Sequence, residues 1–238
     1  MNKTLTLAKK EIASYFNSPL GYIVVSVFLV ASGWLFIQTF FITGQSSMRA
    51  FFNLLPILFI FILPAITMSL WAEEKRSGTV EVLMTFPIKA VGAVLGKFLS
   101  CFAFLSLMLV LTLAIPYMIS NLGDPDTGTM FAGYIGALLL GSSYIAIGLW
   151  VSSVTKNQII SFVITIVIIF AFYIIGNSFI ISSFPPEIAA VCKFLSFNTH
   201  FNSILRGVIS LSDVVYYLSV IIFFLFLNVR VVGIKKWG

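Results

Sequence analysis

Six long stretches of the chain carry no charged side chain, and this feature limits the possible folds more than any other. A helix crosses the hydrocarbon core of a bilayer with about 20 apolar residues, because it rises about 1.5 Å per residue through about 30 Å of lipid. The stretches are 19–48, 50–72, 98–123, 127–155, 157–186 and 214–229. The last one is shorter, but Arg230 can extend its charge to the interface. Since a membrane β-barrel would alternate apolar and polar residues, we expect an all-α integral membrane protein with six transmembrane helices.

We expect these stretches to form a single transmembrane domain, 1–238, in which the spans are joined by connections of unequal length. The expected spans are 20–43, 51–72, 97–120, 130–153, 158–182 and 213–233. An N-terminal segment, 1–18, precedes the first span, and a loop, 73–96, follows the second span. A further external segment, 183–212, precedes the last span.

The composition excludes several classes of protein. Hydrophobic residues make up 60% of the 238 residues and charged residues 9%, which is too apolar for the surface of a soluble domain. The net charge of +6 accompanies 25 phenylalanines in apolar runs, so we expect contact with membrane lipid and no nucleic-acid partner. Two cysteines and one histidine do not suffice for a structural zinc site or a disulfide framework. We therefore expect no metal site and two reduced thiols.

The distribution of Lys and Arg between the spans predicts the orientation of the chain. With the N-terminus in the cytoplasm, three basic residues lie outside, namely Arg49, Lys193 and Arg206. The other eleven lie inside, and they are Lys3, Lys9, Lys10, Lys75, Arg76, Lys89, Lys97, Lys156, Arg230, Lys235 and Lys236. Because positive residues are retained on the cytoplasmic side, we expect both termini there.

The N-terminal segment has the pattern of a helix that lies on the inner membrane surface. At about 100° per residue, one face is apolar and carries Leu5, Ala8, Ile12, Tyr15 and Phe16. The opposite face is polar and carries Lys3, Thr6, Lys10 and Ser14, although Leu7 also falls on it. Asn17, Ser18 and Pro19 are expected to end the helix and to turn the chain into the bilayer. The alternative is a solvated basic tail.

The external segment 183–212 is too apolar for a solvated loop and too interrupted for a span. Short helices that dip into the outer leaflet, or a re-entrant hairpin, fit this composition. His200 lies within it, and we expect this histidine to make an interfacial polar contact in preference to serving as a ligand or base.

The loop 73–96 concentrates charge in a chain that has few charged residues, with Glu73, Glu74 and Glu81 among them. Gly78 can adopt a left-handed conformation that ends one helix, and Ser77 or Thr79 can cap the next. We expect a short helix to follow and to stop near residue 87, where a soluble partner could push on it. The alternative is a solvated loop whose charges only set the topology.

Small residues recur along the fourth span at Gly133, Gly136, Gly141 and Gly148. They predict a close helix crossing, and packing inside one subunit is the preferred interpretation because the spacing differs from the membrane dimer motif.

Resemblance to a known family begins around the second span. The stretch 64–87 reads PAITMSLWAEEKRSGTVEVLMTFP and resembles the region around the first inner loop of ABC-2 type permeases, the membrane subunits of one class of ATP-driven exporter. Further similar stretches read KKEIASYFNSPLGYI, GDPDTGTMFAGYIGALLLGSSYIAIGLWVSSVTKNQIISF and RGVISLSDVVYYLSV. Together they cover nearly the whole chain in order. Within the family, the chain is similar to the permeases associated with gliding motility in Bacteroidetes.

The resemblance implies six helices per subunit, an interfacial N-terminal helix, a coupling helix in the first inner loop and short re-entrant helices before the last span. The residues that it implies for coupling to a separate ATP-binding subunit are Glu73, Glu74, Lys75, Arg76, Ser77, Gly78, Thr79, Glu81, Lys156 and Asn157. On the interfacial helix it implies Lys9, Lys10 and Glu11. It implies no catalytic residue in this chain, and the sequence identifies no substrate-binding residue.

ATP hydrolysis is expected in a partner, because the sequence has no Gly-x-x-x-x-Gly-Lys followed by Ser or Thr. The resemblance thus implies an ABC ATP-binding subunit that holds ATP and magnesium, and a second permease copy or a paired permease, in a bacterial inner membrane. An ion-coupled secondary transporter and a structural membrane anchor are the alternatives, although the spans lack the central charge typical of the former. A membrane-embedded enzyme is disfavoured because no pairing of His with Asp is visible in the sequence.

Overall fold

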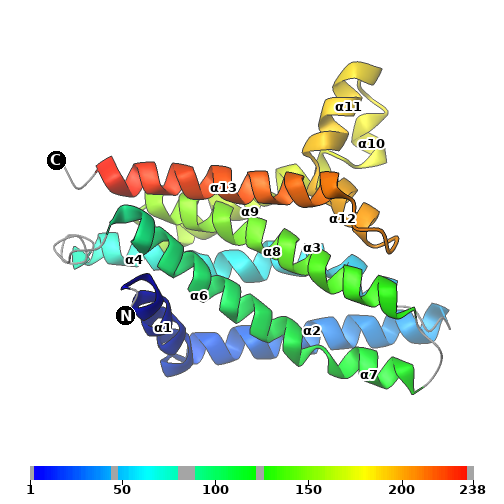
Figure 1. The fold of residues 1–238 in the computed structure, drawn as a ribbon, viewed down its shortest axis with the longest axis horizontal. Coiled ribbons are helices and arrows are strands. Elements are labelled where there is room, and N and C mark those ends of the chain that lie inside the picture. Colours follow the sequence, from blue (N-terminus) through cyan, green and yellow to red (C-terminus); the bar gives the residue numbers. More distant parts are fainter. Residues whose placement is uncertain (1–2, 44–47, 80–88, 122–125, 235–238) are drawn as a thin grey trace.

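The computed structural model describes residues 3–43, 48–79, 89–121 and 126–234, and every regular element in these ranges is a helix (Figure 1). The helices are α1 (Lys3–Asn17), α2 (Pro19–Thr43), α3 (Arg49–Thr67), α4 (Ser69–Arg76), α6 (Ala90–Leu111), α7 (Ala114–Ser120), α8 (Thr127–Val154), α9 (Gln158–Ile174), α10 (Ser178–Ile181), α11 (Pro186–Leu195), α12 (Phe197–Ile204) and α13 (Leu211–Ile234). The all-helical class predicted from the sequence is confirmed for this part of the chain.

Five helical stretches of the described residues are long and apolar enough to cross a membrane. They are Pro19–Phe41, Arg49–Arg76, Ala90–Ser120, Thr127–Val154 and Leu211–Gly233. The expected fifth span, 158–182, is interrupted, because α9 ends at Ile174 after 17 residues and Asn177 caps the separate helix α10. At about 1.5 Å per residue α9 is about 26 Å long, slightly less than the hydrocarbon thickness.

Helix α8 lies at the centre of the bundle, where it packs against α3, α6, α9 and α13. Its glycines allow these close approaches: a side chain at Gly148 would overlap Thr67 of α3, and one at Gly141 would come within 2.6 Å of Leu105 of α6. The prediction that the glycines of this span serve packing inside one subunit is therefore confirmed.

The second membrane stretch is broken at Met68, between α3 and α4. The side chain of Ser152, on α8, forms hydrogen bonds with backbone groups at the break. Its Oγ accepts hydrogen bonds from the backbone N–H groups of Trp71 (3.1 Å) and Ala72 (3.2 Å), and it donates to the carbonyl of Met68 (2.9 Å). The direction of α4 is thus set by α8.

The elements gather at two ends of the bundle (Figure 1). One end, called here the α1–α4 end, carries α1, α4 and the last turn of α13, so the two described ends of the chain lie on the same side. The opposite end, called the α12 end, carries α10, α11 and α12 in the segment for which the sequence predicted short helices.

Candidate functional site

Helix α1 lies against the start of α6 at the α1–α4 end. Leu7 is buried against Gly96 of α6, and its Cδ2 would lie 3.0 Å from a Cβ atom added at Gly96. Leu5, in contrast, is 52% exposed. The predicted face of α1 is therefore wrong for Leu7, which fell on the polar side, because the lack of a side chain at Gly96 makes room for it. Leu5 and Phe16 remain exposed for contact with lipid.

Tyr15 holds the other end of α1 in place. Its hydroxyl donates to the carbonyl of Ile66 (3.3 Å) and lies 3.4 Å from Cys101 Sγ. Burial raises the pKa of the Tyr15 hydroxyl well above its usual value, so the group keeps its proton and its donor role. The helix then ends before Pro19, as predicted, and Ser18 Oγ donates to the carbonyl of Tyr15 (3.3 Å).

Lys97, on α6, joins the two candidate contact elements. Its ammonium group donates to Glu74 Oε1 of α4 (2.7 Å), to Glu11 Oε1 of α1 (3.3 Å) and to the carbonyl of Leu70 (2.8 Å). The Lys97 side chain is 1% exposed, and its Nζ lies 4.8 Å from the ring centroid of Trp71. A buried cation is stable only with such partners. The sequence indicated Lys97 only as a basic residue at the start of the third span.

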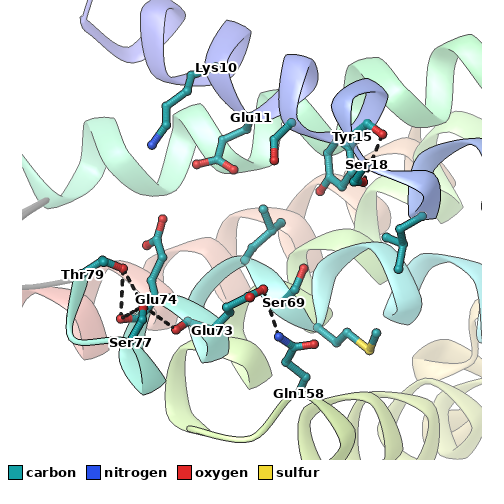
Figure 2. Close-up of a pocket in the computed structure, with 14 residues that line it drawn as sticks. Lys10, Glu11, Tyr15, Ser18, Ser69, Glu73, Glu74, Ser77, Thr79 and Gln158 are labelled. Carbon is teal, nitrogen blue, oxygen red and sulfur yellow. Dashed lines mark hydrogen bonds between the residues drawn. The ribbon is translucent and has the colours of Figure 1, made fainter.

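A cavity of about 630 Å³ opens between α1, α4 and the start of α9. Figure 2 shows Lys10 and Glu11 extending from α1 toward the cavity, with Glu74 approaching from α4 on the other side. Glu73 also lines the cavity, and its Oε2 accepts a hydrogen bond from Gln158 Nε2 (3.0 Å). The site therefore brings together charged residues of α1 and α4 and the amide of Gln158, from three separate parts of the sequence.

The end of α4 has the turn that the sequence predicted at Gly78, whose φ is +72°. The hydroxyls of Ser77 and Thr79 both bond to the last turn of α4. Ser77 Oγ donates to the carbonyl of Glu73 (2.9 Å) and Thr79 Oγ1 to that of Glu74 (3.3 Å), and the predicted cap of the next helix involves residues 80–88, outside the described part of the chain. The Glu73 carbonyl also accepts from the backbone N–H of Ser77 (2.9 Å).

The remaining predicted site residues are not among the described residues that line this cavity. Lys9 is exposed on α1, while Lys75 and Arg76 lie in the last turn of α4. Lys156 is exposed between α8 and α9, and Asn157 caps α9 by accepting from the N–H of Ile159 (2.9 Å). Glu81, and the short helix expected after Thr79, fall in residues 80–88, which lie outside the described part of the chain.

The α12 end contains a hydrogen-bonded contact between His200 and Asp213 that was not predicted from the sequence. His200 Nδ1 lies 2.7 Å from Asp213 Oδ1, and His200 Nε2 lies 2.9 Å from the carbonyl of Phe194. Both ring nitrogens of His200 thus lie within hydrogen-bonding distance of an oxygen. Ser210 donates to the other Asp213 oxygen (2.6 Å), and the Tyr216 ring stacks on His200 at 3.9 Å. This corrects the expectation that no His and Asp are paired, and the contact ties α12 to α13.

The pair does not have the position that ion-coupled transport requires. Asp213 lies in the first turn of α13 and not at its centre, where a coupling charge is usually found. Within the described ranges, no three His, Cys, Asp or Glu side chains are grouped so that they could hold a metal ion.

Comparison with known proteins covers almost the entire chain. A model of the family described as ABC-2 family transporter protein matches residues 9–231. No curated protein matches the chain. The matched range includes α4 and the part of α1 from Lys9 onward, and therefore the residues that line the cavity at the α1–α4 end.

Proposed function

The chain belongs to the ABC-2 transporter family, and from this membership we propose that it is the permease subunit that couples to a separate ATP-binding subunit at the α1–α4 end. Members of this family are membrane components of ABC transporters and are not themselves the catalytic subunit. The observation that carries the proposal is the joining of α1 and α4 through the buried Lys97 beside an open cavity.

In the proposed orientation, the α1–α4 end faces the cytoplasm of a bacterium and the protein lies in the inner membrane. The excess of Lys and Arg in the connections at this end supports that orientation. It places both termini on the side where an ATP-binding subunit and its ATP and magnesium are available.

The proposed mechanism follows from how the coupling elements are attached. A displacement of α4 acts on α3, which precedes it directly, and on α8 through Ser152. It also acts on α1 and α6 through Lys97. An ATP-binding subunit that binds one arrangement of these helices better than another would shift the permease toward that arrangement.

Three finer proposals rest on the resemblance of the sequence. We propose that transport runs outward and that the permease acts with a second copy of itself or with a paired permease. We also propose that the chain belongs to the permeases associated with gliding motility. Exposed apolar side chains on α2, including Val27, Val30 and Trp34, offer a surface for lipid or for such a second permease.

Glu73 offers the cleanest test of the coupling site. Glu74 is unsuitable because reversing its charge would also place a second cation beside Lys97. We expect the tagged chain, purified in mild detergent, to recover an ATP-binding subunit. Glu73→Lys should lower the recovery of the ATP-binding subunit, or ATP hydrolysis in liposomes, by about tenfold, because a reversed charge at an interface repels the partner.

Glu187→Lys provides the matched control, because Glu187 is an exposed carboxylate on α11 at the other end of the bundle. This variant should recover the subunit as the parent does. Purification of the parent chain without any ATP-binding subunit, or equal behaviour of the two variants, would contradict the proposal and favour a secondary transporter or a membrane anchor.

A further inference from the structure

Two adjoining cavities lie at the α12 end, far from the coupling site. The larger, of about 470 Å³, lies between the α9–α10 junction and helices α11 and α12. The smaller, of about 210 Å³, lies beside the start of α3. Asn202 and Arg206 line both cavities, so the two form one continuous polar surface.

The charges around this surface all have one sign. Lys193 lines the larger cavity, Arg49 the smaller and Arg206 both, and among the described residues no carboxylate lines either of them. These are the three basic residues that the sequence placed outside the membrane, and they come from three different elements. In the described ranges, neither Lys193 nor Arg206 makes an ion pair with a carboxylate.

The remaining lining of the larger cavity consists mainly of amides and hydroxyls, including those of Asn177, Asn198 and Thr199. Cationic groups form strong charge-assisted hydrogen bonds with phosphate oxygens, and Arg can bind them with two parallel bonds. Amides and hydroxyls both donate to and accept from alcohol groups. The lining therefore matches a phosphate that carries hydroxyl groups close by.

The backbone holds this surface in place. Gly207 has φ +89° and forms the turn after α12, with its N–H bonded to the carbonyl of Ile204 (3.0 Å), which fixes the adjacent Arg206. At Gly176 a side chain would overlap Ser196, so the end of α9 approaches α12 closely. The cavity between them is therefore built by the packing of helices and not by a single loop.

Exposed apolar side chains lie on α10 and α11, two helices that also contribute lining residues to the larger cavity. Phe179 of α10 is 84% exposed, and Val191 and Phe194 of α11 are 58% and 59% exposed. Figure 1 shows α10 and α11 projecting from the side of the bundle. A polar, cationic cavity beside exposed apolar side chains matches an amphiphile with an anionic headgroup, as in the basic headgroup pockets of other membrane proteins.

We propose that the cavities at the α12 end bind the phosphate headgroup of an anionic lipid that also carries hydroxyl groups. This inference goes beyond the proposed function, because it requires neither ATP nor an ATP-binding subunit. Its failure would therefore leave the coupling proposal unaffected, and loss of coupling would leave the lipid site unaffected.

The test measures lipid binding to the purified full-length chain by native mass spectrometry. The probes are phosphatidylglycerol, phosphatidylcholine with the same acyl chains, and free glycerol phosphate. We expect phosphatidylglycerol to bind most tightly. The variant Lys193→Gln/Arg206→Gln should weaken its binding by at least about tenfold, since two charge-assisted contacts are lost.

Three further variants control for folding and for unspecific attraction. Arg230→Gln removes a cation from the last part of α13, at the α1–α4 end, and should change the affinity by less than about twofold. Lys193→Arg/Arg206→Lys keeps both charges and should keep binding. Asn202→Asp introduces a carboxylate of the same shape into the wall that the cavities share, and should weaken binding.

Several results would overturn the proposal. One is a loss in the double glutamine variant no larger than that in Arg230→Gln, and another is equal affinity for phosphatidylcholine and phosphatidylglycerol. Equal binding of free glycerol phosphate would overturn the assignment to a lipid, because the acyl chains would then contribute nothing.

Discussion

Lys97 is the charged residue that is most completely removed from solvent among those of the coupling site. Its three acceptors come from α1 and α4, which are otherwise attached to the bundle by separate contacts. Removal of one member of such a cluster leaves the other charges without compensation, which is more damaging than replacement of the whole cluster.

We predict that Lys97→Met lowers the free energy of unfolding by about 3 kcal/mol, because Glu11 and Glu74 then face each other without a cation. Thermal unfolding of the purified protein in mild detergent would measure the loss. The triple variant Lys97→Met/Glu11→Gln/Glu74→Gln should regain at least half of it. If the triple variant were as unstable as the single one, the charge balance would not be the cause.

Gly148 permits the closest approach between α8 and α3. We predict that Gly148→Ala destabilises the protein by about 1–3 kcal/mol, since the added methyl group overlaps Thr67. Gly33→Ala on α2 is the matched control, because no atom lies within 4 Å of the added group, and it should be neutral or slightly stabilising. Thermal unfolding measures the stability of the two variants. Adding Thr67→Ala should restore the stability of Gly148→Ala if the overlap with Thr67 is the cause of the loss.

Some residues of the site were predictable because their roles depend on near neighbours in sequence. Gly78 adopts the left-handed conformation that a helix end favours, and Ser18 lies at the expected break. Lys97 was not predictable as a buried residue, because its partner Glu11 is 86 residues away. The same holds for His200, whose contact with Asp213 depends on how α12 packs against α13.

Helix α1 shows how an element is positioned by protein contacts as well as by lipid. Its amphipathic pattern predicted a surface helix, but the pattern alone could not show which leucine faces inward. Gly96 of α6 decides this by leaving room for Leu7. At the other end, Gly21 of α2 approaches the carbonyl of Tyr15 so closely that no side chain fits there.

We predict that Gly21→Ala displaces α1 from α6, because the methyl group would overlap backbone, which cannot move as a flexible side chain does. The measurement is the labelling of Leu7→Cys by a maleimide, which should be slow in the parent and at least about tenfold faster with Gly21→Ala, as expected when a buried position opens. Gly33→Ala on the same helix should leave the rate unchanged. The two native cysteines are buried, and their labelling in the protein without Leu7→Cys gives the background rate. Unchanged labelling with Gly21→Ala would show that the turn tolerates a side chain.

At the scale of the whole molecule, the number of spans depends on α9. Apolar runs predicted the position of each long helix, because helix rise and lipid thickness are general quantities. They did not predict that α9 stops at Ile174, since this depends on Gly176 allowing α12 to pack against the end of α9. With 17 residues, α9 is at the lower limit for a transmembrane helix.

We predict that α9 does cross the membrane, so that the residues before and after it are accessible from opposite sides. In intact cells, a membrane-impermeant maleimide should label Ser183→Cys, which is exposed between α10 and α11. Lys156→Cys, exposed before α9, should be labelled only after the membrane is permeabilised. If α9 does not cross, both positions share one side and give the same result before permeabilisation. The cavities at the α12 end would then lie on the same side of the membrane as Lys156 instead of across the bilayer from it. This labelling pattern therefore decides which leaflet could supply the lipid that these cavities are proposed to bind.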